Sequence, residues 1–175
     1  MAYITLEFFF ATLFLFLIYL IFSLIPNNVY YIPSQIAQEK AVELLQELLP
    51  ECGICEVATY NNLQFIDQGE NLELIYCPLC KVEVQFADLS EDFMENWLEI
   101  EQTGKENGYE AIEVLMPCCN NKALFTDLTF YWPAGFAKFE LSVEDPQVAE
   151  KLPPDQVGEL EKILGCKLYQ IWTLY

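Results

Sequence analysis

The sequence predicts an α+β protein, with a mostly antiparallel sheet, about three packed helices and a zinc-ribbon-like double hairpin, preceded by one transmembrane helix. Three observations lead to this prediction. Apolar and polar residues alternate in several short segments, which indicates half-buried strands. Apolar residues recur at helical spacing in other segments, and an almost unbroken apolar run stands near the start of the chain. The 175 residues are enough for one anchor, residues 1–26, and one acidic domain, residues 27–175.

The apolar run extends from Ile4 to Ile25 and carries one charged residue, Glu7. A helix of this length reaches roughly 33 Å, which is enough to cross the hydrocarbon core of a bilayer. A cleaved signal peptide is the alternative, but no basic residue precedes the run and no small-x-small cleavage site follows it. We therefore expect a single-pass membrane protein, with Glu7 at the head-group level and Pro26 as the end of the helix.

The elements of the acidic domain follow from periodicity and from turn residues. Strands are expected at residues 29–32, 54–60, 63–66, 72–76, 82–86, 111–116, 124–131, 138–144 and 168–175. Helices are expected to begin at Ser34, Ser90 and Pro153 and to end at Pro50, Gly104 and Gly165. Asn61 and Asn62 favour a turn that makes residues 54–66 a hairpin. No internal repeat is evident by inspection.

The charge of the chain excludes several classes of function. It has 27 acidic and 8 basic residues, a net charge of −19 and no histidine, and every basic residue is a lysine. A Ser-His-Asp triad, a Cys-His dyad and a histidine metal ligand are therefore excluded, as is an arginine clamp for phosphate. A body this acidic repels the nucleic-acid backbone. Its surface suits either simple solubility or a basic partner protein.

Six of the seven cysteines lie in close pairs, and two of these pairs follow expected strands. Cys77-x2-Cys80 and Cys118-Cys119 fall within residues 72–131, each between two strands. In a zinc ribbon, two hairpin tips each offer two thiolates to one tetrahedral ion. We therefore predict that Cys77, Cys80, Cys118 and Cys119 bind a structural zinc ion; the alternative is a set of free core cysteines or disulfides.

The remaining cysteines leave more than one interpretation open. Cys52-x2-Cys55 could replace a ligand of the other pairs, hold a second metal or be inert, so these two residues are secondary metal candidates. Cys166 stands alone beside the end of a helix and is expected to contribute only packing. Close cysteine pairs are typical of metal ligands in a reducing compartment, which favours a cytoplasmic location for the acidic domain.

A catalytic role for the cysteines is the main alternative. Cys77-Pro78-Leu79-Cys80 resembles a glutaredoxin motif, but in glutaredoxins the second cysteine lies in a helix, whereas here the strand-like segment 81–86 follows. Four thiolates also close the shell of a zinc ion, and a catalytic zinc keeps one position open. The sequence therefore favours a protein that is not an enzyme, with a thiol oxidoreductase using Cys77 and Cys80 as the alternative.

Four segments, CPLC, MPCC, FTDLTFYWPAGFAKFEL and ELEKILGCKLYQIW, resemble a family of small, acidic, uncharacterised bacterial proteins with a CPxC…PCC…WPAGFA signature. The resemblance covers roughly Val29 to Tyr175. It implies that Cys77, Cys80, Cys118 and Cys119 are shared metal candidates. Cys52, Cys55 and the apolar N-terminal segment depart from the family pattern. The family brings no function with it.

Together these observations predict a membrane-anchored, zinc-stabilised acidic interaction or accessory module. Its expected contacts are a membrane, through residues 4–25, and a basic protein, as in an immunity protein. A zinc-dependent assembly scaffold that works through the anchor helix is a further hypothesis. Neither the biological process nor the oligomeric state follows from the sequence.

Overall fold

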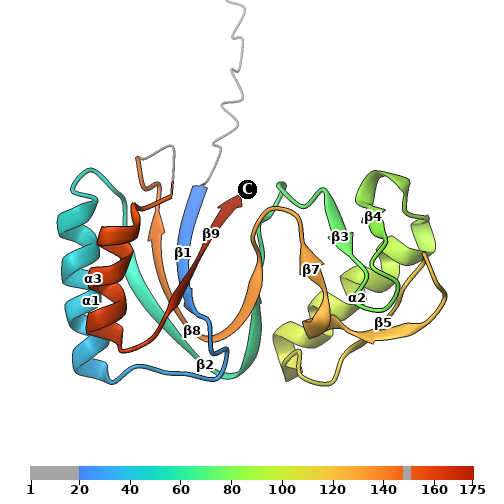
Figure 1. Cartoon of the computed structure of the whole chain (residues 1–175), viewed down its shortest axis with the longest axis horizontal. Coiled ribbons are helices and arrows are strands. Elements are labelled where there is room, and N and C mark those ends of the chain that lie inside the picture. Colours follow the sequence, from blue (N-terminus) through green and yellow to red (C-terminus); the bar gives the residue numbers. More distant parts are fainter. Residues whose placement is uncertain (1–19, 148–150) are drawn as a thin grey trace, which may run out of the picture.

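The structure is a computed structural model that describes residues 20–147 and 151–175. Its largest element is a four-stranded antiparallel sheet of strand order β2-β8-β1-β9. The strands of this sheet are β1 (Leu20–Pro26), β2 (Cys55–Ile66), β8 (Gly135–Glu144) and β9 (Leu168–Leu174). Two helices, α1 (Gln35–Leu48) and α3 (Pro154–Leu164), cover one face of it (Figure 1).

We call this sheet with its two helices the sheet lobe. Side chains alternate between the two faces of a strand and repeat every 3.6 residues around a helix. Alternate residues of β1 and β8 therefore point toward the helices and contact the apolar faces of α1 and α3. The core residues at this interface include Phe22, Leu24, Phe139, Leu141, Val143, Ala41, Leu45, Leu160 and Leu164, each at most 1% exposed. Ser34 caps α1, and Gly165 ends α3 in the left-handed conformation, as predicted.

The rest of the chain forms a second body, which we call the knuckle lobe (residues 72–134). Its strands are short: β3 (Leu74–Tyr76), β4 (Glu83–Gln85), β5 (Glu113–Leu115), β6 (Lys122–Leu124) and β7 (Thr129–Phe130). Helix α2 (Glu91–Asn107) begins at its cap Ser90 and packs Phe93, Trp97 and Ile100 inward. Two short 3₁₀ turns, η1 (Phe86–Asp88) and η2 (Phe125–Asp127), follow β4 and β6.

An aromatic cluster joins the two lobes. The fully buried Phe125 ring lies 4.9 Å from Trp97 and 5.5 Å from Tyr109, centroid to centroid. Phe65 of β2 and Phe136 of β8 enter the same cluster, because these two long strands stay paired beyond β1 and curve toward the knuckle lobe (Figure 1). Offset and edge-on aromatic pairs of this kind stabilise beyond their buried area. The α+β class, the antiparallel pairing and the three helices are therefore confirmed.

The predicted transmembrane helix is wrong for its last six residues. Leu20–Pro26 form β1, which pairs with β8 on one side and β9 on the other. β1 is a central strand whose residues 22–26 are all buried, so it is apolar at nearly every position and resembles a membrane helix in the sequence. No helix within 20–147 and 151–175 is long and apolar enough to cross a bilayer. Residues 4–19 lie outside the described residues, so the anchor and the cytoplasmic location stay predictions.

Three further predictions of local structure are corrected. Residues 29–32 form a turn and an irregular segment instead of a strand. Residues 54–66 are one strand instead of a hairpin, because Asn61 and Asn62 lie in an irregularity where β2 is displaced from its partner β8 between Thr59 and Gln64. Helix α2 continues through Gly104 to Asn107; a side chain at Gly104 would come within 2.2 Å of the Tyr109 ring, so this glycine serves packing instead of ending the helix.

Candidate metal centre

The two cysteine pairs lie at the tips of two hairpins, as predicted. Cys77 and Cys80 lie in the turn between β3 and β4, and Cys118 and Cys119 lie in the turn between β5 and β6. Each turn is closed by two backbone hydrogen bonds. In the first, Cys77 N–H donates to Val82 O at 3.0 Å and Lys81 N–H donates to Cys77 O at 3.0 Å. Such tight turns make backbone N–H groups available to the thiolates that the tip carries.

The second turn repeats the first bond for bond. Met116 N–H donates to Asn121 O at 2.9 Å, and Asn120 N–H donates to Met116 O at 2.8 Å. Lys81 and Asn120 occupy matching positions with φ of 64° and 56°, in the left-handed region that few side chains adopt. The two tips therefore have the same backbone conformation, although one carries a C-x2-C pair and the other two adjacent cysteines.

This correspondence extends to an internal repeat that inspection of the sequence missed. Residues 73–89 align without a gap on residues 112–128. Pro78, Cys80, Phe86, Asp88 and Leu89 match Pro117, Cys119, Phe125, Asp127 and Leu128. Both units end in a 3₁₀ turn, and in both the phenylalanine N–H donates to the carbonyl of the residue that begins the unit, at 2.8 Å. The P-x-C and F-x-D-L identities at constant spacing were the signal in the sequence.

The repeat defines which ligands correspond. Cys80 and Cys119 are equivalent, whereas Cys77 corresponds to Met116 and Cys118 corresponds to Leu79. Cys77 and Met116 are both fully buried in the knuckle-lobe core. The two tips thus contribute their second cysteine from the same position and their other cysteine from different positions.

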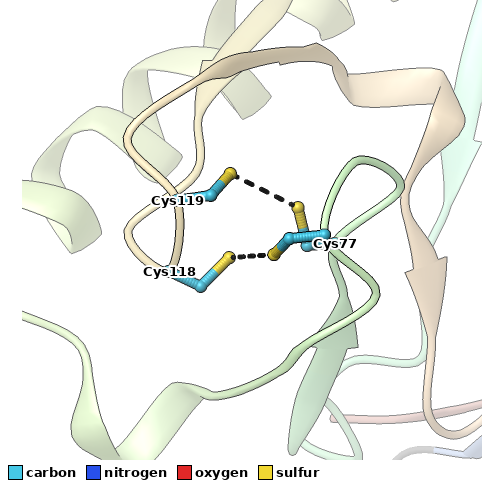
Figure 2. A group of neighbouring side chains, drawn as sticks. Cys77, Cys118 and Cys119 are labelled. Atoms are coloured by element: carbon cyan, nitrogen blue, oxygen red, sulfur yellow. Dashed lines mark hydrogen bonds between the residues drawn. The ribbon is translucent and has the colours of Figure 1, made fainter.

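The four sulfurs converge between the tips (Figure 2). Cys80 Sγ lies 3.4 Å from Cys118 Sγ, Cys77 Sγ lies 3.9 Å from Cys119 Sγ, and all four sulfurs lie within 4.8 Å of one another. Four thiolates at about 2.3 Å from a tetrahedral zinc ion would be separated by about 3.8 Å. The four cysteines are therefore close enough to bind one metal ion, whose identity the geometry leaves open.

Burial differs across the cluster. Cys77 is buried and Cys119 is half-buried against the knuckle-lobe core, whereas Cys80 and Cys118 are exposed. The cluster therefore lies at the surface, with one side closed by the protein core and the other open to solvent.

The ionisation of the thiols shows the effect of this environment. Burial raises the pKa of Cys77, but hydrogen bonds from the backbone N–H groups of Cys80 and Leu79, together with those from the Cys80 and Cys118 thiols, outweigh it and lower the pKa from 9.0 to about 7. Burial, followed by the neighbouring Cys80 and Cys77 sulfurs, raises the pKa of Cys118 from 9.0 to about 12. Without a cation, each thiolate thus disfavours the next one.

The secondary metal candidates lie elsewhere. Cys52, in the connection from α1 to β2, and Cys55, the first residue of β2, have their Sγ atoms 3.4 Å apart, against the core of the sheet lobe. Among the described residues, no third cysteine or carboxylate completes a metal cluster with them. Cys166 packs against the same core, where burial raises its pKa. Metal binding by Cys52 and Cys55 stays a prediction.

A second polar cluster, which sequence reasoning also missed, lies on the sheet face opposite the helices. Glu140 of β8 accepts hydrogen bonds from Ser23 Oγ at 2.6 Å and from Tyr60 Oη at 2.8 Å. Burial, and then the Glu140 charge, raises the pKa of Tyr60 above its usual range. These bonds explain a fully buried serine in an otherwise apolar central strand, because a buried hydroxyl requires a partner.

No family model matches the chain, and no curated protein or solved structure is significantly similar to it. The resemblance to the CPxC…PCC…WPAGFA family therefore stays a prediction, and the interpretation of the site rests on its own geometry.

Proposed function

We propose that Cys77, Cys80, Cys118 and Cys119 hold one structural zinc ion, and that the chain is a non-catalytic acidic module that binds a basic protein partner. The observation that supports the metal site is the convergence of four sulfurs from two hairpin tips within 4.8 Å. Zinc is the preferred ion because tetrahedral all-thiolate sites are typical of structural zinc. Four thiolates fill its coordination shell, so no position is left for a substrate or a water molecule.

The charge distribution supports the binding role. The net charge is −19, and three of the lysines already pair with glutamates: Lys105 with Glu101, Lys122 with Glu113 and Lys167 with Glu161. Negative charge is therefore in large excess over the surface. Such a field accelerates the association of positively charged partners and is weakened by salt.

The metal content of purified protein tests the first half of this proposal. We expect one equivalent of zinc per chain, measured by elemental analysis, and loss of that equivalent when Cys77 or Cys119 is replaced by serine. The matched control is Cys52→Ser/Cys55→Ser, which removes the same chemical groups from the sheet lobe and should leave one equivalent in place. Two equivalents in the unaltered protein and one in the control would place a second ion at Cys52 and Cys55.

The same preparation tests the alternative function, thiol oxidoreduction by Cys77 and Cys80. We expect no oxidoreductase activity, because Cys77 and Cys80 lie in the turn between two strands, whereas a redox pair begins a helix. A redox dithiol would react with iodoacetamide at neutral pH and would reduce a disulfide substrate, whereas a zinc-bound pair would be protected until a chelator removed the ion. Reactive Cys77 and Cys80 in metal-free protein as purified would overturn the zinc proposal.

A further inference from the structure

A groove lies along β2. It is a groove of about 770 Å³ between one side of α1 and the strand β2. Helix α1 contributes residues at helical spacing, and β2 contributes Val57 and Thr59, which alternate along the strand, together with Tyr60 and Asn61. The groove is lined by Ile32, Gln35, Gln38, Glu39, Val42, Glu43, Val57, Thr59, Tyr60 and Asn61.

The edge of the sheet beside this groove is open. β2 is the first strand of the order β2-β8-β1-β9, so only one of its two edges is paired. Apart from the pairing with β8, none of the hydrogen bonds found within residues 20–147 and 151–175 involves the backbone of residues 56–60. Alternate N–H and C=O groups of this segment therefore point outward, available to another strand.

Natural edge strands are usually protected against such pairing by lysine or proline. Residues 56–60 contain neither; their sequence is EVATY. Glu56 is the one charged residue of this segment, and β2 keeps its regular pairing with β8 from Cys55 to Thr59, before the irregularity that includes Tyr60 and Asn61. A groove between a helix and an open sheet edge is the geometry in which domains bind an extended peptide as an added strand.

The lining defines the chemistry of the occupant. Val42 and Val57, both half-buried, and Ile32, 45% exposed, are the aliphatic residues of the lining. Glu39 and Glu43 are exposed on its rim, and no lysine lines it. An added strand would place alternate side chains against α1, where cationic side chains would meet the two carboxylates.

We infer that this groove binds an extended basic segment of a partner protein, which adds as a strand to the open edge of β2. The inference rests on the proposed function and specifies where the basic partner binds. A second copy of the chain is disfavoured as the occupant, because two bodies of charge −19 would bring Glu39, Glu43 and Glu56 of both copies together.

The test uses zinc-loaded protein and a fluorescein-labelled seven-residue peptide of alternating lysine and valine, followed by fluorescence anisotropy at low salt. Two further peptides carry N-methyl groups, either on every valine or on every lysine, which removes the N–H groups of one edge and keeps the charge. Strand addition requires one edge only, so we expect one methylated peptide to bind like the parent and the other to lose at least tenfold in affinity.

Two charge-reversed variants of the protein test whether the peptide binds at the groove. Glu39→Lys/Glu43→Lys alters the groove rim and should weaken binding about tenfold or more. Glu95→Lys/Glu99→Lys is the matched control, since both glutamates are exposed on α2 at the same spacing and the net charge changes equally; it should weaken binding less than about threefold. Slower amide hydrogen exchange of residues 56–60 in the presence of peptide is the expected direct readout.

The outcomes separate this inference from the proposed function. If the parent and both methylated peptides bind equally, and the two charge-reversed proteins weaken binding equally, the groove inference fails while binding of basic segments survives. If none of the peptides binds at low salt, the proposed binding role fails as well. If the protein alone is a dimer by light scattering and residues 56–60 are protected without peptide, a second copy occupies the edge and the inference is overturned.

Discussion

The two lobes are built by different means from the same chain. The strands of the sheet lobe are 7 to 12 residues long and two helices cover them, whereas the strands of the knuckle lobe are 2 or 3 residues long and one helix supports them. An isolated two-stranded hairpin is at best marginally stable in water. The four cysteines that could bind a metal ion thus lie in the lobe with the short strands.

The position of the cluster agrees with this view. Hairpins β3–β4 and β5–β6 belong to separate small sheets, and the order of strands shows no backbone pairing between them. A metal ion bound by both tips would connect two hairpins that are separated in sequence by the whole of α2. The free energy of binding such an ion is free energy of folding when the site does not exist in the unfolded chain. The core of the sheet lobe contains none of these four cysteines.

Removal of the metal should produce the largest difference in stability between the two lobes. With a chelator such as EDTA, we expect the amides of Cys77, Met116 and Asn120 to lose their protection from hydrogen exchange, because the turns that protect them lose their cross-link. Amides of the central strands, such as Phe22 and Leu141, should keep theirs. Exchange measured by mass spectrometry on fragments of both lobes checks this, and protection should return when zinc is added back.

The opposite result would also be informative. If both lobes lose protection together, the aromatic cluster around Phe65 and Phe125 makes them one cooperative unit, and the two-lobe description does not extend to stability. If neither lobe loses protection, metal binding by the four cysteines does not contribute to the stability of the fold.

The repeat allows a finer test within the knuckle lobe, with a smaller expected effect. Cys118→Leu removes one ligand and places at this position the residue that occupies the equivalent position, Leu79. We expect this variant to lose zinc affinity by at least about a hundredfold. Adding Met116→Cys supplies a cysteine at the position equivalent to Cys77, and affinity should recover to within about tenfold. Competition with a chromophoric chelator measures both values.

Met116→Leu is the control for that pair, since an apolar substitution of similar volume should leave zinc affinity unchanged. If the double variant binds no better than Cys118→Leu alone, the two tips are alike only in their backbone and the ligand positions cannot be exchanged.

The sequence predicted the elements that depend on local signals. Ser34 and Ser90 cap helices, Gly165 ends one, and the two cysteine turns lie between short strands. These features depend on the residue type and its neighbours, so they can be recognised without the fold. The convergence of the four sulfurs also followed, because each pair was already placed at the tip of a hairpin.

The errors arose where tertiary structure determines the pattern. Leu20–Pro26 is a central strand in which residues 22–26 are all buried, so its side chains on both faces are apolar except Ser23, and a membrane selects the same apolar run for a helix. Asn61 and Asn62 tolerate turn conformations, and β2 uses them to leave its regular pairing with β8 without reversing direction. The groove beside α1 could not be predicted, because the open edge of β2 follows from the strand order alone.

The helix caps provide the most sensitive test of whether the lobes are stabilised separately. Ser34 Oγ accepts a hydrogen bond from Ala37 N–H at 3.4 Å in the sheet lobe, and Ser90 Oγ accepts one from Phe93 N–H at 3.3 Å in the knuckle lobe. Replacing either serine by alanine should lower the free energy of unfolding by about 1 kcal/mol in zinc-loaded protein. Without zinc, Ser34→Ala should keep its effect in urea unfolding and Ser90→Ala should lose it, because α2 no longer belongs to a folded lobe. Equal effects in both forms would show that α2 stays packed without the metal, so that its aromatic contacts with the sheet lobe, not the cysteine cluster, hold it in place.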